Sequence, residues 1–168
     1  MTHVENTSHK QDKHFLFDVE LNWTSQQKGT LSSESVDGEI DVATPVLFGG
    51  EGRDWSPEHL LLSAVSSCFM TTFLVFAKKF GFEISNFQCN AVGQVRLVEG
   101  KYQFTQIDVF PKVALQNESM MTKAKLALEK AEKYCLVSNS INAEVIYHGE
   151  LLVQAEQEHA VKSSYAIL

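Results

Sequence analysis

The sequence predicts an α+β fold with a mainly antiparallel sheet, in the order strand, strand, strand, helix, strand, strand, helix, strand. Three observations lead to this prediction. Residues 15–23 alternate apolar and polar side chains, as a half-buried strand does. Residues 60–77 carry no charge and lie between helix start and stop signals. Two long strand-like segments, 84–98 and 101–113, meet at Glu99-Gly100, a short turn of the hairpin type.

The N-terminal third predicts a meander of three strands. Polar residues near 25–28 form a turn after the strand at 15–23, and a second strand covers about residues 30–35. Asp37-Gly38 is a turn dipeptide, so a third strand at 39–43 follows in the antiparallel sense. The stretch 44–54 contains one proline and three glycines. We expect it to turn the chain into the next helix, although such glycines also let a backbone approach a ligand.

The uncharged segment predicts a central helix that must be covered. Ser56 is a suitable N-cap, Pro57 fits the first helical position and Glu58 complements the helix dipole. Two lysines followed by Gly81 mark its end. About eighteen uncharged residues are the lower limit for a membrane span, but five serines and threonines and the lack of a flanking basic loop argue against one. We therefore expect this helix to be buried between a sheet and another helix, which a second subunit could supply.

The C-terminal half predicts a hairpin, a helix and a final strand. Asn117 is a candidate N-cap for an amphipathic helix at 118–134. A last strand is expected at 143–155. The resulting division is a flexible N-terminal tail at 1–13, a single domain at 14–156 and a C-terminal tail at 157–168.

Composition excludes several classes of function. The chain has 168 residues and a formal net charge of −7, which argues against a nucleic-acid surface. The first residues lack the apolar run of a secretory signal, so the cytoplasm is the expected location. No compact set of cysteines and histidines has metal-ligand spacing, and no nucleotide motif is present. We expect neither a metal nor a cofactor, and neither a nucleic acid nor a membrane as partner.

The three cysteines are the main candidates for chemistry. Cys68 lies inside the central helix and Cys135 at the end of the next one, 67 positions later. Spacing alone does not pair them, and free cysteine is also common as a small buried apolar residue. Cys89 lies in a predicted strand and is expected to be structural, while His59 and His148 have no assigned role.

Two motifs resemble the OsmC/Ohr family, named for osmotically inducible protein C and organic hydroperoxide resistance protein. The first is Ser-Pro-Glu-His-Leu-Leu, which starts at Ser56; its glutamate lies ten residues before Cys68. The second is Cys-Leu-Val-Ser-Asn, which starts at Cys135. The similarity covers about residues 15–152. It implies the order of elements given above and an intertwined homodimer with the two cysteine helices at its centre.

The resemblance also implies an activity. Cys68 would be the peroxidatic thiolate, which attacks a hydroperoxide, and Cys135 would be the resolving thiol, which then forms a disulfide with it. The implied substrates are organic hydroperoxides, with hydrogen peroxide as a further candidate, and the implied reductant is a dithiol such as a dihydrolipoyl group, or a small thiol. The alternative is a non-enzymatic OsmC-like protein that binds a small hydrophobic ligand and keeps its cysteines as structural residues.

The sequence departs from the family pattern around the first cysteine. Family members generally place an arginine in the first hairpin turn, held by the glutamate that matches Glu58, but this turn has none. Either Lys28 or Arg53 is the cationic partner in its place, or Cys68 is less activated than in the hydroperoxidases of the family. Many members also carry proline where this chain has Leu136. Ten helical residues place Glu58 about 15 Å from Cys68 along one straight helix. Glu58 therefore either supports a site shared across a dimer or serves only the helix N-terminus.

Overall fold

A computed structural model of the protein describes residues 13–153. These residues form two compact units, divided between Pro57 and Glu58. The C-terminal tail predicted at 157–168 and all but Lys13 of the predicted N-terminal tail lie outside the described residues. Each unit is described in turn.

The first unit is the predicted three-stranded meander. Strands β1 (Glu20–Ser25), β2 (Lys28–Ser32) and β3 (Ile40–Ala43) pair in the order β1-β2-β3, and both pairings are antiparallel. The prediction that the first strand begins at residue 15 was wrong. The ladder between β1 and β2 ends where Glu20 lies opposite Ser32, so earlier residues have no partner strand. Strand β2 stops at that point because the Ser33 hydroxyl accepts the backbone N–H of Ser35 (3.2 Å), a local bond that competes with the ladder.

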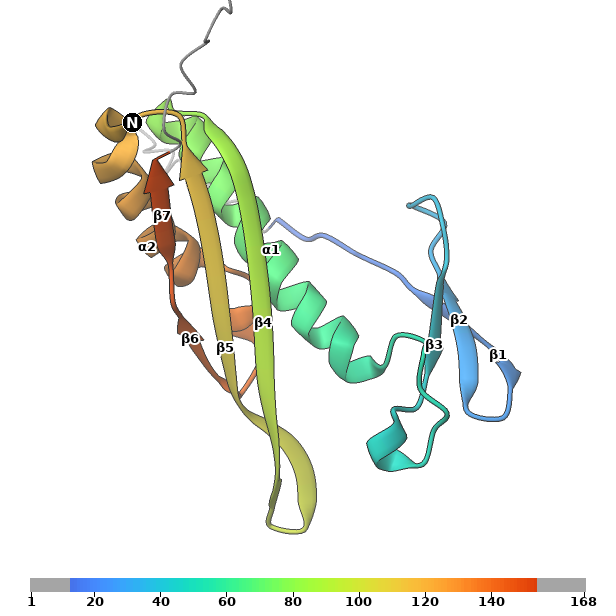
Figure 1. Ribbon diagram of the computed structural model, residues 1–168. Helices are drawn as coiled ribbons and strands as arrows, with labels where there is room; N and C mark the ends of the chain where they lie inside the picture. The colour runs from blue at the N-terminus through green and yellow to red at the C-terminus, as the bar shows by residue number, and fades with distance from the viewer. Residues whose placement is uncertain (1–12, 154–168) are drawn as a thin grey trace, which may run out of the picture. The chain divides into compact units, whose positions relative to one another are not determined.

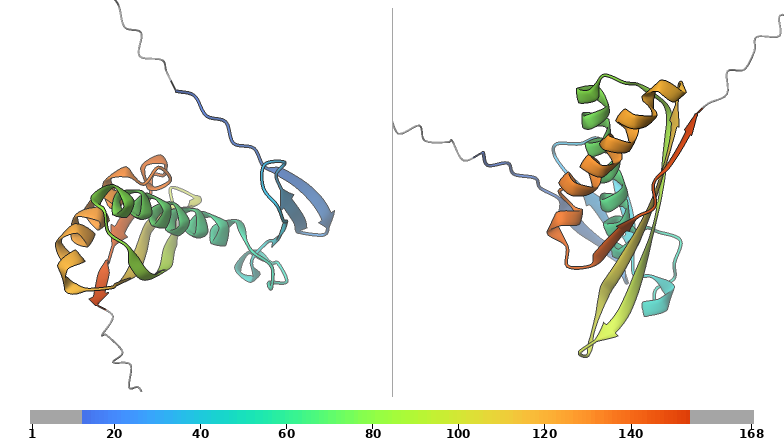
Figure 2. Two further views of the ribbon diagram at one scale, coloured as in Figure 1. Left: turned by 90° about the horizontal axis from the view of Figure 1, so that it is seen from above. Right: turned by 90° about the vertical axis from the view of Figure 1, so that its left-hand side faces the viewer.

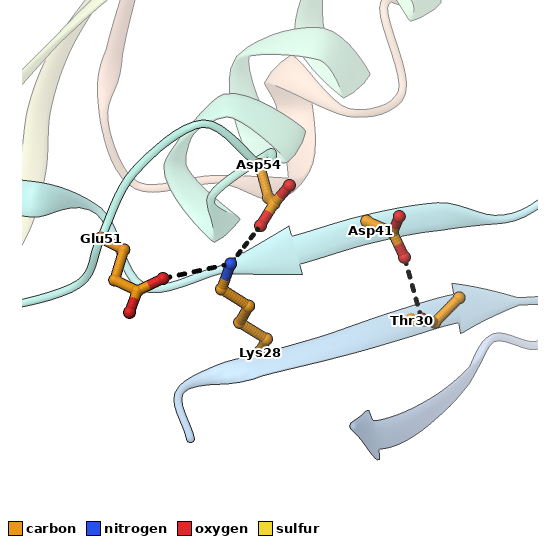
Figure 3. A network of polar contacts seen from close by, with 5 residues as sticks. All are labelled: Lys28, Thr30, Asp41, Glu51 and Asp54. Carbon is orange, nitrogen blue, oxygen red and sulfur yellow. Dashed lines mark hydrogen bonds and ion pairs between the residues drawn. The ribbon is translucent and has the colours of Figure 1, made fainter. Parts of the chain in front are cut away.

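Residues 44–54 of the first unit are held by side-chain contacts around Lys28 (Figure 3). They include a short 3-10 helix, η1 (Val46–Phe48), that the sequence analysis missed. The Lys28 Nζ lies 3.4 Å from Glu51 Oε2 and 3.3 Å from Asp54 Oδ2, and so ties this loop to strand β2. On the neighbouring strands, the Thr30 hydroxyl donates to Asp41 (3.0 Å).

The second unit begins with the predicted central helix, α1 (Pro57–Phe80). Its start and its end agree with the sequence signals. Gly81 adopts a left-handed φ of 68°, and the N–H of Phe82 bonds the carbonyl of Ala77 (3.1 Å), which closes the helix with a Schellman motif. By length and hydropathy α1 is the one candidate membrane span among the described residues, a test that core helices of soluble proteins also pass.

The sheet of the second unit contains the predicted hairpin. Strands β4 (Ile84–Val98) and β5 (Lys101–Leu115) pair antiparallel along their whole length. After β5, η2 (Glu118–Met120) and α2 (Met121–Tyr134) form the predicted second helix. Helices α1 and α2 lie on the same face of this sheet (Figure 1, Figure 2).

The last predicted strand is two strands in the structure. They are β6 (Glu144–Tyr147) and β7 (Glu150–Val153), and both run parallel to β5, so this sheet is mixed. The connection through α2 is a crossover, which returns the chain in the parallel sense. The break follows from Pro111. The carbonyl of Val109 accepts the N–H of His148, so the backbone of Val109 faces the edge of β5 on which β6 and β7 pair. Pro111 lies two residues further along β5 and faces the same edge. Proline has no N–H, so Pro111 cannot donate a ladder hydrogen bond there. The end of the predicted strand, at residue 155, lies outside the described residues.

The core lies between the helices and the sheet. One face of α1 is buried at intervals of four residues, by Val65, Phe69, Phe73 and Ala77. It packs against the inward side chains of β5 and the buried alanines of α2. The other side of α1 is open in this chain: Leu74 is 40% exposed and Val75 is 64% exposed. The helix is therefore buried on one face rather than all round.

Candidate active site

Cys68 lies in the middle of α1, at the edge of the buried face. The next residue, Phe69, is fully buried, whereas Cys68 is partly buried and packs against the larger core cluster. A thiol in this position is held by a rigid element and still has access to small molecules.

Cys135 lies at the point where α2 ends. Its backbone N–H bonds the carbonyl of Ala131 (2.9 Å), as the last bond of the helix, and its backbone then becomes extended. The side chain is fully buried. The next residues turn into a 3-10 helix, η3 (Ser138–Ser140).

The fold places Cys68 against the core cluster that contains Cys135. The pKa of Cys68 is raised by partial burial but lowered further by hydrogen bonds, in decreasing order from the backbone of Val137, the Cys135 thiol, the backbone of Leu136 and the Thr72 hydroxyl. The balance places the pKa of Cys68 below that of an ordinary cysteine. Backbone N–H groups that point at a sulfur stabilise its anionic form, as they do for other anions. Both cysteines are free thiols in this structure.

Two hydroxyl groups beside Cys135 belong to residues to which the sequence assigned no role. The Ser138 hydroxyl donates to the Cys135 sulfur (3.2 Å) and also lies 2.6 Å from the Tyr147 hydroxyl. The Tyr147 ring stacks on Phe69 with 4.8 Å between ring centroids. Ser138 belongs to the motif that follows Cys135, which is the one available clue. Tyr147 is 79 positions from Cys68, and only the fold could reveal it.

Glu58 lies in the first turn of α1, ten residues before Cys68 on one continuous helix. Its Oε2 atom is buried and has no hydrogen-bond partner among residues 13–153. A buried carboxylate oxygen without a hydrogen bond lowers the stability of the folded protein, so we expect a hydrogen-bond donor to bind this atom. The predicted role of Glu58 at the thiol site stays a prediction.

The two candidate cations differ in how they are used. Lys28 is shared by Glu51 and Asp54, whose hydrogen bonds raise its pKa, with Asp54 the larger cause. Arg53 has a left-handed φ of 85° and forms no ion pair within the part of the chain that the structure describes. Its predicted role as the cationic partner of Cys68 stays a prediction.

The remaining candidate residues lie elsewhere. Cys89, on β4, has a pKa raised to about 11, chiefly by burial, which opposes any role as a nucleophile. His148 lies 2.8 Å from Asp108 on the other face of the sheet and stacks on Phe110. No group of three metal-ligating side chains occurs among the described residues.

The arrangement of Cys68 and Cys135 suits two-electron redox chemistry at sulfur. One thiol is partly buried and has a pKa below that of an ordinary cysteine, and the second thiol belongs to the core cluster against which the first packs. A nucleophilic thiolate beside a second thiol can be oxidised and then closed to a disulfide.

Comparison with known proteins decides the family. Residues 50–147 match the model of the family described as OsmC-like protein, more than half of the chain. The chain belongs to this family. The OsmC-like chain is also 26% identical over 137 residues to the uncharacterized protein YmaD of Bacillus subtilis, which covers 80% of this chain and 90% of that protein.

Solved structures of OsmC-like proteins have the same fold. An OsmC-like protein of unknown function from Vibrio cholerae superposes with a TM-score of 0.70, at 21% identity, over 79% of this chain and 97% of its own. An organic hydroperoxide resistance protein from Elizabethkingia anophelis superposes with a TM-score of 0.65, at 18% identity, over 84% of this chain and all of its own. The predictions of an α+β OsmC-like fold and of the OsmC/Ohr family are therefore confirmed.

Proposed function

We propose that this protein is a thiol-dependent peroxidase that reduces organic hydroperoxides, and also hydrogen peroxide, in defence against oxidative stress in the cytoplasm. The observation that carries the proposal is that Cys68 packs against the core cluster that contains Cys135, and that the Cys135 side chain and the backbone after α2 lower the pKa of Cys68 below that of an ordinary cysteine. A fold that used both cysteines only as core residues would have no need of backbone donors aimed at one of them.

The proposed cycle has three steps. The Cys68 thiolate attacks the distal oxygen of the hydroperoxide; the O–O bond breaks, the alkoxide takes up a proton, and Cys68 becomes a sulfenic acid. The Cys135 sulfur then attacks Cys68, the S–O bond breaks, and water leaves with the Cys135 proton. A dithiol, such as a dihydrolipoyl group, or small thiols then reduce the disulfide to two thiols and are themselves oxidised to a disulfide.

Arg53 and Glu58 are the proposed supporting residues. Lys28 is already shared by two carboxylates, so Arg53 is the cation that remains available of the two candidates. The buried, unpaired Oε2 of Glu58 supports a role beyond the helix dipole, since a charge at the dipole alone needs no burial.

A homodimer is part of the proposal. Apolar side chains on the outer side of α1, such as Val75, are exposed in the single chain. Strand β4, of 15 residues, also has no partner on its second edge among residues 13–153. Both features are liabilities in a free monomer, and a second copy of the chain would cover them.

Peroxide consumption by purified protein tests the activity. Cumene hydroperoxide and hydrogen peroxide are supplied with dihydrolipoamide or dithiothreitol, and wild type is compared with Cys68→Ser, Cys135→Ser and Cys89→Ser. We expect wild type and Cys89→Ser to turn over, Cys68→Ser to be inactive, and Cys135→Ser to stop at a sulfenic acid that dimedone traps on Cys68.

The cysteine variants also separate the two candidate functions. If wild type and all three variants are equally inert while folded, the peroxidase proposal fails. The cysteines would then be structural, and binding of a small hydrophobic ligand would become the function to test.

A further inference from the structure

The hydrogen bonds beside Cys135 form a series in which each donor points toward Cys135. Ser138 has a single hydroxyl hydrogen, and it points at the Cys135 sulfur. The 2.6 Å contact between Ser138 and Tyr147 must therefore use the Tyr147 hydrogen, so Tyr147 donates to Ser138.

The same series of interactions continues from Cys135 to Cys68. Cys68 packs against the core cluster that contains Cys135, and the Cys135 side chain lowers the pKa of Cys68, as a thiol that directs its hydrogen toward that sulfur does. The two hydrogen bonds thus point the same way, from Tyr147 through Ser138 to Cys135, and Cys135 in turn acts on Cys68. Hydrogen bonds in such a series polarise one another and strengthen together, most of all where water is excluded.

The secondary-structure elements that carry Tyr147 and Ser138 hold these hydrogen bonds in place. Tyr147 is the last residue of β6 and lies opposite Val109 of β5, while its ring stacks on Phe69, the residue next to Cys68. Ser138 is fixed as the first residue of η3. Neither hydroxyl depends on a mobile side chain, because a phenol ring and a one-carbon side chain lose little rotational freedom.

The burial of Cys135 explains why it needs these donors. Its side chain is fully buried, so loss of its proton would place an anion in an apolar core. The resolving step requires this loss, because Cys135 must give up its hydrogen as it bonds to Cys68. A hydroxyl already aimed at the sulfur offsets the cost of the negative charge.

We propose that Ser138 and Tyr147 are positioning residues of the reaction, which act through Cys135 to hold its hydrogen toward Cys68 and to stabilise the negative charge on Cys135 during disulfide formation. This inference rests on the proposed peroxidase function for its second part. Its first part, the effect on the Cys68 thiol, can be measured without any peroxide.

Few titratable groups lie around this series of hydrogen bonds. They are the two thiols, Tyr147 on β6 and Glu132 on α2. The pKa of Tyr147 is raised chiefly by burial; the hydrogen bond with Ser138 lowers it by less, and Cys135 and Glu132 add smaller upward contributions, so Tyr147 keeps its hydrogen throughout the neutral range and remains a donor. A change in Cys68 ionisation on removal of either hydroxyl therefore reports on the hydrogen bonds themselves.

The test uses Ser138→Ala and Tyr147→Phe, each with a matched control. Ser140→Ala removes a hydroxyl from the same 3-10 helix, but one that donates to the carbonyl of Leu136 and not to a sulfur. Tyr134→Phe removes a phenol hydroxyl from an exposed residue that precedes Cys135. Tyr147→Phe keeps the ring that stacks on Phe69, and circular dichroism with thermal melting confirms that each variant is folded.

The first readout is the rate at which iodoacetamide alkylates Cys68 as a function of pH, followed by peptide mass spectrometry. We expect the pH profile to move to higher pH, with alkylation near neutral pH slowed about tenfold in Ser138→Ala and about threefold in Tyr147→Phe, while both controls match wild type. Ser138→Thr keeps a hydroxyl and should restore the wild-type profile.

The second readout is the lifetime of the Cys68 sulfenic acid after one equivalent of cumene hydroperoxide, from dimedone trapping. We expect the lifetime to lengthen about tenfold in Ser138→Ala, because Cys135 attacks more slowly. If wild type does not react with hydroperoxide, the proposed function fails and the alkylation profile alone decides the inference. Wild-type alkylation profiles in both folded variants would overturn it.

Discussion

At the scale of single residues, the structure separates two cysteines that the sequence could only rank by their motifs. Cys68 has a lowered pKa because hydrogen bonds outweigh its partial burial, whereas burial raises the pKa of Cys89 to about 11. The difference lies in the donors around each sulfur: Cys68 faces the turn after α2, and Cys89 meets mainly apolar side chains of the core.

These opposite shifts predict the order in which the thiols react. In wild-type protein, iodoacetamide should alkylate Cys68 well before Cys89 at neutral pH, since at a pKa of about 11 only about one Cys89 in ten thousand is a thiolate at pH 7. As pH falls, the Cys68 rate should decline only when pH passes below its lowered pKa. Peptide mass spectrometry of partially alkylated protein gives both rates.

Unfolded protein is the control for this comparison. In urea the two thiols should react at similar rates and with the pH profile of ordinary cysteine, because the environments that separate them are gone. Faster labelling of Cys89 than of Cys68 in the folded protein would contradict the assignment of Cys68 as the reactive thiol.

A second prediction at this scale concerns the cationic partner. On the proposed role of Arg53, we expect Arg53→Gln to raise the pKa of Cys68 and slow its alkylation about threefold to tenfold, because loss of a cationic partner raises the pKa of a thiol. Lys28→Gln is the matched variant and should leave Cys68 unchanged, because Glu51 and Asp54 already share that ammonium group. Wild-type profiles in both variants would remove Arg53 from the proposed site.

At the scale of elements, local chemistry predicted some boundaries and not others. The ends of α1 follow from Pro57 and Gly81, whose backbone preferences act within one turn of helix. The break between β6 and β7 could not be predicted in this way. It depends on Pro111 of a different strand, and the pairing of β6 with β5 is set by the crossover through α2.

The end of α1 gives a testable case of such local chemistry. Gly81→Ala should lower the free energy of unfolding by about 1 kcal/mol, because the left-handed φ of 68° costs an alanine about that much. A Cβ at this position meets no atom within 4 Å, so the cost is conformational and not steric. Gly81→Asn should cost less, since asparagine tolerates this conformation better.

Urea unfolding measures this effect as a change of midpoint at constant slope. Glu83→Ala, at an exposed position two residues later, is the control and should change the stability by less than about 0.5 kcal/mol. The turn at Gly81 matters because the next residue, Phe82, is buried and meets Phe73 edge-on at 6.2 Å. An alanine variant as stable as wild type would mean that the helix end rearranges at no cost.

At the scale of the whole molecule, the candidate site depends on long-range contacts. Motif resemblance predicted that Cys68 and Cys135 act together, but nothing between them in the sequence specifies their distance. The contact requires α2 to pack across α1 on one face of the sheet, so that its last turn ends beside the middle of α1 (Figure 1). Tyr147 reaches the same place only because β6 pairs with β5.

The open side of α1 leads to the prediction for the assembly. Val75 is 64% exposed although α1 is more apolar than α2, and a second copy of the chain is the proposed cover. We expect wild type to be a dimer by size-exclusion chromatography with light scattering, with a melting temperature that rises with protein concentration. Val75→Asp should give a folded monomer, because a carboxylate at this position is solvated in the single chain but desolvated and unpaired in the dimer.

Thr122→Asp controls for the added charge in that experiment, since it places one negative charge at an exposed position of α2 and should remain dimeric. A monomeric wild type would contradict the proposed homodimer, and a dimeric Val75→Asp would move the interface away from this side of α1.

The monomeric variant then answers a further question. If it keeps the wild-type alkylation profile of Cys68, the hydrogen bonds from Cys135 and the turn after α2 suffice to activate the thiol within one chain. If the profile shifts to higher pH, the second copy contributes to the site, which is the role predicted for Glu58 across a dimer.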